Sequence, residues 1–214
     1  MYMKKCRFLF VRHGESEGNL NNIFLGHTDL ELTPLGHRQA SLTARYLDSM
    51  PIDAIYSSDL KRAWQTAEHI ADRRGLSIIA DTAFREIYAG KWEGMKYDEI
   101  SEMYPEDFRK WRNELGFAVC TGGESVKEVL ERVEAEVVRL ADMYDGMTVC
   151  IATHATPIRV MRAVSLGLGL AGVSSKGPAN ASVTVIDMCG GKPEMVTDGY
   201  SGHLSGMITI PKNV

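Results

Sequence analysis

The chain has 214 residues, with 24 Lys+Arg against 28 Asp+Glu, a formal net charge of -4 and 44% hydrophobic residues. This is the composition of a soluble globular protein. It excludes intrinsic disorder, and only 7 prolines and 20 glycines exclude collagen-like and low-complexity chains. The mild acidity disfavours nonspecific binding to nucleic acid or to an anionic membrane.

The first half of the chain alternates apolar strand patterns with helical spacing. Thr33 is expected to cap a helix that Pro34 opens, because proline at the first helical position loses no hydrogen bond. Gly75 is expected to end the following helix. The elements predicted here are strands at 7–11, 54–56 and 76–80 and helices at 34–47 and 60–71.

The middle of the chain, residues 87–121, is less regular and is expected to form a short cap-like insertion. Two short helices are predicted within it, at 97–103 and 105–113. Ser125 and Glu128 then fit a capping box, which begins a long helix with one apolar stripe over 126–141.

The last third of the chain returns to the alternating pattern. A strand at 148–152 places His154 at its carboxyl end, and a helix runs from Thr156 to about 166. Late strands are predicted at 182–187 and 194–198. Strands separated by helices favour a layered α/β fold with functional residues beyond the strand ends. No repeat or linker appears, so residues 1–214 are expected to form one domain.

The four cysteines indicate an intracellular protein. They are far apart in the sequence and form no Cys-x-x-Cys pair, which excludes a zinc ribbon and a dense disulfide framework. No stretch approaches the roughly 18 apolar residues of a membrane span. We therefore expect a cytoplasmic location, no membrane partner and mostly buried cysteines: Cys6, Cys120, Cys150 and Cys189.

Arg12, His13 and Gly14 follow directly on the first strand. An arginine and a histidine at a strand-to-loop turn, with a glycine that lets the backbone approach a ligand, suit the binding of an oxyanion. Alone the motif is weak, because a single histidine at such a position is more often structural. Arg62 and Glu86 alone would equally be taken for a solvated helix charge and a surface carboxylate.

Several segments taken together, in their order, closely resemble the signature of the histidine phosphatase superfamily, the phosphoglycerate mutase-like proteins. The resemblance spans roughly residues 7–187. It implies a three-layer α/β sandwich, with a mostly parallel central sheet and helices on both faces. The matching segments are 10–16 (FVRHGES) with Asn19, 32–40 (LTPLGHRQA), 55–63 (IYSSDLKRA) with Thr66, 84–87 (FREI) with 90–94 (GKWEG), 122–125 (GGES), and 149–159 around His154.

The resemblance implies hydrolysis of a phosphomonoester on a small phosphorylated metabolite. His13 would attack phosphorus as a neutral imidazole and form a phosphohistidine. Arg12 and Arg62 would hold phosphoryl oxygens and disfavour an imidazolium at His13, and His154 would bind another oxygen. Glu86 matches the position of the acid that protonates the leaving oxygen and later activates water.

The resemblance also implies contacts around the phosphoryl group from residues outside this set. They are Asn19, Ser16, Gly26 and Ala155. No histidine pair has the spacing of metal ligands and no Asp-rich loop occurs, so neither a metal nor another cofactor is expected. The choice between monomer and homodimer stays open.

Four positions depart from the family pattern. Ala155 stands where glycine usually follows the second histidine, which puts its backbone contact to phosphate in doubt. Gly18, Ile23 and Leu25 replace a tryptophan, a basic residue and an amide that many phosphatase members carry. The phosphoryl-binding residues are therefore retained, while the wall that recognises the substrate has lost polar groups. Specificity is expected from the 20–30 loop and from residues 87–121.

Three alternative functions remain at this stage. A phosphoglycerate mutase would need a longer insertion than 87–121 and a basic pair within it, so water is the simpler acceptor. A non-catalytic protein that binds a phospho-ligand on the same fold is disfavoured because all five catalytic positions are retained. A dinucleotide-dependent oxidoreductase lacks its G-x-G-x-x-G sequence after the first strand.

Overall fold

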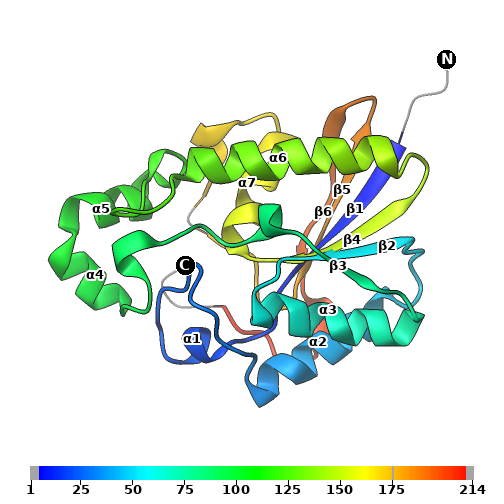
Figure 1. Cartoon of the computed structure of the whole chain (residues 1–214), viewed down its shortest axis with the longest axis horizontal. Coiled ribbons are helices and arrows are strands. Elements are labelled where there is room, and N and C mark those ends of the chain that lie inside the picture. The colour runs from blue at the N-terminus through cyan, green and yellow to red at the C-terminus, as the bar shows by residue number, and fades with distance from the viewer. Residues whose placement is uncertain (1–4, 175, 211–214) are drawn as a thin grey trace.

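The computed structural model describes residues 5–174 and 176–210 and contains a mixed β-sheet between two layers of helices (Figure 1). The strand order is β3-β2-β4-β1-β5-β6. The first four strands in this order pair in parallel with their neighbours, whereas β5 pairs antiparallel with both β1 and β6. The strands are β1 (Lys5–Arg12), β2 (Ala54–Ser57), β3 (Ile78–Ala80), β4 (Thr148–Thr153), β5 (Val183–Cys189) and β6 (Lys192–Tyr200).

Helices cover both faces of the sheet, which confirms the predicted three-layer α/β sandwich. Alternate residues of β1 enter two different cores, because successive side chains of a strand point to opposite faces. Phe8 and Phe10 pack toward α6 and α7, whereas Leu9 and Val11 pack toward α2 and α3. These helices are α2 (Pro34–Leu47), α3 (Lys61–Arg74), α6 (Val126–Met143) and α7 (Ala155–Ser165).

The predicted helix ends are confirmed by their hydrogen bonds. The Thr33 side chain accepts the backbone N–H of Gly36, and Gly75 ends α3 in the left-handed conformation with φ of 65°. Ser125 and Glu128 form the reciprocal capping box of α6. The sequence did not predict the one-turn helix α1 (Glu17–Leu20), and β3 begins two residues later than expected.

Residues 87–121, here called the cap segment, contain the two predicted helices α4 (Tyr97–Met103) and α5 (Pro105–Asn113). Phe24 ties the 20–30 loop to this segment, because its ring lies 5.0 Å from that of Trp111 and 5.5 Å from those of Trp92 and Tyr97. These edge-to-face and tilted contacts bury Phe24 and Trp92 and hold the two least regular regions together. Short 3-10 turns lie at Thr82–Phe84, Gly90–Trp92, Leu115–Phe117, Leu170–Gly172 and Gly202–Leu204.

The four cysteines are free thiols in the structure. Cys6, Cys120 and Cys150 are buried as expected, and Cys189 is partly exposed. Within residues 5–174 and 176–210, no helix combines the length and the apolar character that a membrane crossing requires.

Candidate active site

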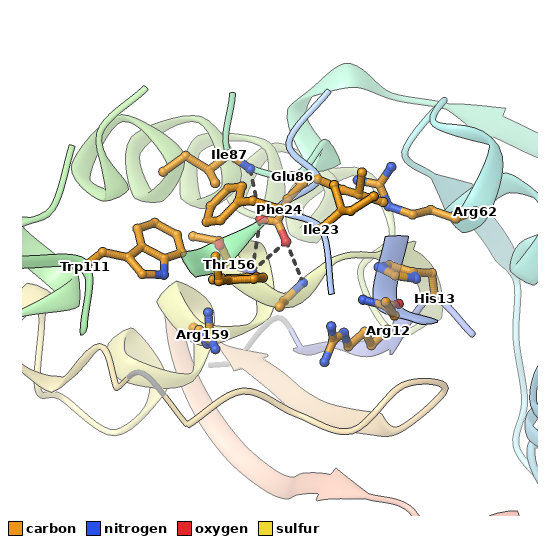
Figure 2. Close-up of a pocket in the computed structure, with 14 residues that line it drawn as sticks. Arg12, His13, Ile23, Phe24, Arg62, Glu86, Ile87, Trp111, Thr156 and Arg159 are labelled. Carbon is orange, nitrogen blue, oxygen red and sulfur yellow. Dashed lines mark hydrogen bonds between the residues drawn. The ribbon is translucent and has the colours of Figure 1, made fainter. Parts of the chain in front are cut away.

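A pocket with an empty volume of about 420 Å³ lies beyond the carboxyl ends of β1 and β4 (Figure 2). Parallel sheets place ligand sites at this edge, because the loops that leave the strands meet there. Six of the nine predicted site residues line the pocket: Arg12, His13, Asn19, Arg62, Glu86 and Ala155. The other three, Ser16, Gly26 and His154, lie behind them.

His13 directly follows β1 and is 4% exposed. Its Nδ1 lies 2.7 Å from the carbonyl oxygen of Gly14, which can only accept, so Nδ1 carries the proton and Nε2 keeps its lone pair. Burial, together with the charges of Arg62 and Arg12, holds the pKa of His13 well below its ordinary value. The ring is therefore neutral at physiological pH, as a nucleophile requires.

Arg12 ends β1 and Arg62 lies in the first turn of α3, and both side chains are buried. Arg12 donates to the carbonyl of Pro178, and Arg62 donates to the carbonyls of Gly26 at 2.8 Å and Thr28 at 3.0 Å. Burial lowers the pKa of each guanidinium to about 10, so both remain charged at neutral pH. Gly26 thus lies behind Arg62 and orients it.

His154 follows β4 and is fully buried beside His13, with the two ring centres 5.2 Å apart. Its Nε2 lies 2.8 Å from the hydroxyl of Ser58, a residue that the sequence did not single out. Burial and the neighbouring charge of Arg62 hold the pKa of His154 well below its ordinary value. Among the described residues its Nδ1 has no hydrogen-bond partner.

Glu86 sits at the amino terminus of α7. Its carboxyl group accepts the backbone N–H groups of Ala155 at 3.1 Å, Thr156 at 3.2 Å and Ile87 at 2.9 Å. These three hydrogen bonds fix the carboxyl group against the first turn of α7. Ala155 therefore lines the pocket but donates its amide to Glu86.

Asn19 is fixed by its neighbours rather than by its own helix alone. Its Oδ1 accepts from the amide of Ser16 at 3.1 Å and from Nδ2 of Asn180 at 3.0 Å, which leaves the Asn19 Nδ2 group to donate elsewhere. Asn180 is buried and also donates to the carbonyl of His13. Ser16 thus positions Asn19 in the pocket lining, and Asn180 is a site residue that the sequence did not reveal.

Gly14 is required for a reason that the sequence did not show. A Cβ at Gly14 would lie 2.4 Å from the carbonyl oxygen of Gly36, in the first turn of α2. Close packing of the loop against α2 therefore excludes a side chain at this position.

The rest of the pocket wall is built from residues outside the nine predicted site residues, several of them in the 20–30 loop and at 87–121, the regions from which specificity is expected (Figure 2). Arg159 is the most notable, since it lies four residues after Ala155 on the same face of α7, and that spacing was the available signal. The remaining lining residues are Ile23, Phe24, Leu25, Ile87, Tyr97, Trp111 and Thr156.

Three guanidiniums and one carboxyl group line the pocket, so it suits an anion. The guanidiniums belong to Arg12, Arg62 and Arg159, and the carboxyl group to Glu86. Among residues 5–174 and 176–210, no group of three or more His, Cys, Asp or Glu side chains is placed to hold a metal ion.

Comparison with known proteins gives one family. The family model of the histidine phosphatase superfamily (branch 1) matches residues 8–199. Phosphoserine phosphatase 1 of Hydrogenobacter thermophilus is 38% identical over 182 residues, which are 85% of this chain and 86% of the relative. The solved structure of Bacillus stearothermophilus YhfR has a TM-score of 0.89 and 30% identity, covering 94% of this chain and all of that one (100%). A mycobacterial glucosyl-3-phosphoglycerate phosphatase with inorganic phosphate has a TM-score of 0.81 and 28% identity, covering 93% and 99%.

Proposed function

Because the chain belongs to the histidine phosphatase superfamily, branch 1, we propose that it hydrolyses a small phosphorylated metabolite through a phosphohistidine intermediate, without a metal ion. The observation that carries the proposal is the neutral ring of His13, whose Nε2 lone pair is free of the proton while the buried Arg12 and Arg62 lie nearby. A charged imidazole could not attack phosphorus, and an oxyanion needs fixed positive charge.

In the first half of the reaction, Nε2 of His13 forms a bond to phosphorus while the bond between phosphorus and the ester oxygen breaks. Glu86 donates its proton to that leaving oxygen. Arg12 and Arg62 stabilise the charge on the three transferred oxygens, which is the largest contribution expected in phosphoryl transfer. His154, whose ring centre lies 5.2 Å from that of His13, would bind one of the same oxygens.

In the second half, a water molecule attacks phosphorus and the bond between nitrogen and phosphorus breaks. Glu86 takes the proton from that water and is then ready for the next cycle. Inorganic phosphate leaves with His13 neutral again. Relatives named for phosphoserine and glucosyl-3-phosphoglycerate phosphatases support water, rather than a second substrate hydroxyl, as the acceptor.

The test is a turnover screen combined with chemical trapping. Purified protein is offered an aryl phosphate, sugar phosphates, phosphoglycerates and nucleotides, with released phosphate as the readout. We expect turnover, and acid-labile, base-stable phosphate on the protein after rapid quenching of labelled substrate. His13→Ala should abolish the trapped phosphate and reduce turnover by about 10,000-fold or more.

His37→Ala is the matched control, because His37 lies on α2, with its ring paired to His69 of α3, and outside the pocket. This variant should keep both the turnover of phosphate esters and the trapped phosphate. Trapped phosphate in His13→Ala, or turnover at the rate of the unmodified protein, would contradict the role given to His13.

A further inference from the structure

Arg62, unlike Arg12, reaches the pocket from a helix rather than from a strand (Figure 2). Its guanidinium donates to the carbonyl oxygens of Gly26 and Thr28, at 2.8 and 3.0 Å. Both carbonyls belong to the 20–30 loop, which lies outside the sheet. The direction of the Arg62 guanidinium therefore depends on whatever holds that loop in place.

Glu93 of the cap segment holds the loop. Among the described residues, its carboxyl group accepts four hydrogen bonds. Oε1 accepts the backbone N–H of His27 at 2.7 Å and that of Ala89 at 3.0 Å. Oε2 accepts the backbone N–H of Thr28 at 2.8 Å and the Thr28 hydroxyl at 2.5 Å. The stretch 26–28 is thus held by Glu93 through its N–H groups, while its carbonyl oxygens hold the guanidinium.

The loop packs closely against the cap segment at Gly26. A Cβ there would lie 2.3 Å from Oε1 of Glu93 and 2.4 Å from the carbonyl oxygen of Ile87, so no side chain fits between the loop and the carboxyl group. The His27 ring joins the same contact, because its Nε2 donates to the carbonyl oxygen of Glu86 at 3.1 Å. The loop is therefore fixed to the segment that carries Glu86.

The negative charge of Glu93 matters as much as its shape. Burial raises the pKa of this carboxyl group, but hydrogen bonds from Thr28, His27 and Ala89 outweigh burial and hold the pKa below its ordinary value. Burial lowers the pKa of Arg62, and the charge of Glu93 is among those that oppose this shift. An amide at position 93 would lose the charge and would turn an NH₂ group toward one pair of the four donors.

We propose that Glu93 is a positioning residue, which holds the stretch 26–28 so that its carbonyl oxygens aim the Arg62 guanidinium at the transferred phosphoryl group. Glu93 does not line the pocket, so it acts through Arg62 rather than on the substrate. This inference rests on the proposed function, because it gives Glu93 a part in binding the phosphoryl group.

Glu93→Gln tests the proposal with a nearly isosteric change. We expect kcat/KM to fall by about 10- to 100-fold for aryl and alkyl phosphates alike, since a misplacement of about 1 Å can cost about 100-fold in rate. The decisive measurement is a double-mutant cycle with Arg62→Met. In the Arg62→Met background, Glu93→Gln should change kcat/KM by less than about twofold, because the group through which it acts is gone. The same fall in both backgrounds would indicate a purely structural role and would overturn the inference.

Two further variants control the result. Glu99→Gln is the matched control, because Glu99 is an exposed carboxylate of the cap segment that accepts the backbone N–H of Lys96 at 2.9 Å, outside the pocket. Its kcat/KM should be unchanged. Thr28→Val removes only the hydroxyl donor to Glu93 and keeps the carbonyl oxygen that Arg62 binds, so it should give a smaller fall, again absent in the Arg62→Met background. This variant tests the proposal even where Glu93→Gln folds poorly.

Binding of inorganic phosphate, measured by calorimetry, separates this inference from the proposed function. Phosphate should bind about 10-fold more weakly to Glu93→Gln, the smaller end of the range for hydrogen bonds to a charged group, and this difference should disappear in the Arg62→Met background. That pattern would support the positioning role even in a protein that hydrolysed no ester, a result that would refute the proposed hydrolysis. Full phosphate affinity and full kcat/KM in Glu93→Gln, with phosphohistidine still trapped, would overturn the inference and leave the proposed function standing.

Discussion

The two ends of the pocket are built in different ways. At the phosphoryl end, Arg12, His13 and His154 stand at the carboxyl ends of two central strands, where the backbone of the sheet fixes them. At the leaving-group end, Phe24 and Trp111 come from segments nearly 90 residues apart in the sequence and lie outside the sheet, where their ring contact and backbone hydrogen bonds from Phe24 to residues 94–95 hold the two segments together. In the proposed function, the phosphoryl chemistry therefore depends on the sheet, and selectivity depends on a packed surface outside it.

This contrast predicts that changes at the phosphoryl end affect all esters equally. Arg62→Met should reduce kcat/KM by about 1,000-fold or more for every ester, since arginines that stabilise a transferred phosphoryl group contribute 10³ to 10⁵. Steady-state kinetics with an aryl phosphate and with an alkyl phosphate measures this loss. Arg73→Met removes an exposed arginine of the same helix, paired with Asp48, and should have no effect. A loss confined to one ester would contradict the assignment of Arg62 to the phosphoryl end of the pocket.

Glu86 lies where the two ends meet, and its variant should separate esters by leaving group. Glu86→Gln cannot donate a proton, so alkyl esters should slow by about 100- to 10,000-fold, the range for general acid catalysis. Aryl phosphates should slow much less, because their leaving oxygen needs no proton. Glu102→Gln, an exposed carboxylate of α4, serves as the control. Equal losses on both kinds of ester would contradict the role of Glu86.

At the leaving-group end, Phe24→Ala should destabilise the fold and reduce the differences in kcat/KM between esters. The phosphoryl chemistry should remain. Removing a buried phenylalanine costs about 3 to 5 kcal/mol of unfolding free energy. Urea unfolding measures that cost, and trapped phosphohistidine shows that the chemistry persists. Phe117→Ala, 60% exposed in the cap segment, should change stability by about 0.5 kcal/mol or less. Loss of the trapped intermediate in Phe24→Ala would show that the two ends are not separable.

The smallest effect concerns pH. His13 and His154 have lowered pKa values in the folded protein, so the unfolded chain binds protons that the folded one does not once the pH falls below about 6.5. Unfolding free energy is then lost on acidification, by at most about 1.4 kcal/mol per pH unit for each histidine. His154→Gln should remove the contribution of one histidine to the slope of unfolding free energy against pH, between about pH 6.5 and 5.5. Urea unfolding over that window measures it, and an unchanged slope would contradict the burial of a neutral His154.

Elements with local signals were predictable from the sequence. Thr33 with Pro34, Gly75, and Ser125 with Glu128 each satisfy helix-end backbone groups within a few residues, so their roles could be read without the fold. The effect of Arg12 and Arg62 on His13 was also foreseen, but its larger cause is burial, which depends on the whole fold.

Residues that depend on distant contacts could not be predicted. Arg159 looks like any helix charge until the loop at 176–179 closes over it. Asn180 follows no motif, and only the folded chain brings it to His13 and Asn19. The attachment of Glu86 to the amino terminus of α7 joins residues about 70 positions apart, and nothing local indicates it.

That attachment couples Glu86 to the first turn of α7. The amide hydrogens of Ala155 and Thr156 are bonded to the Glu86 carboxyl group, so the rate at which they exchange with deuterated solvent reports how firmly Glu86 is held, without any chromophore or substrate.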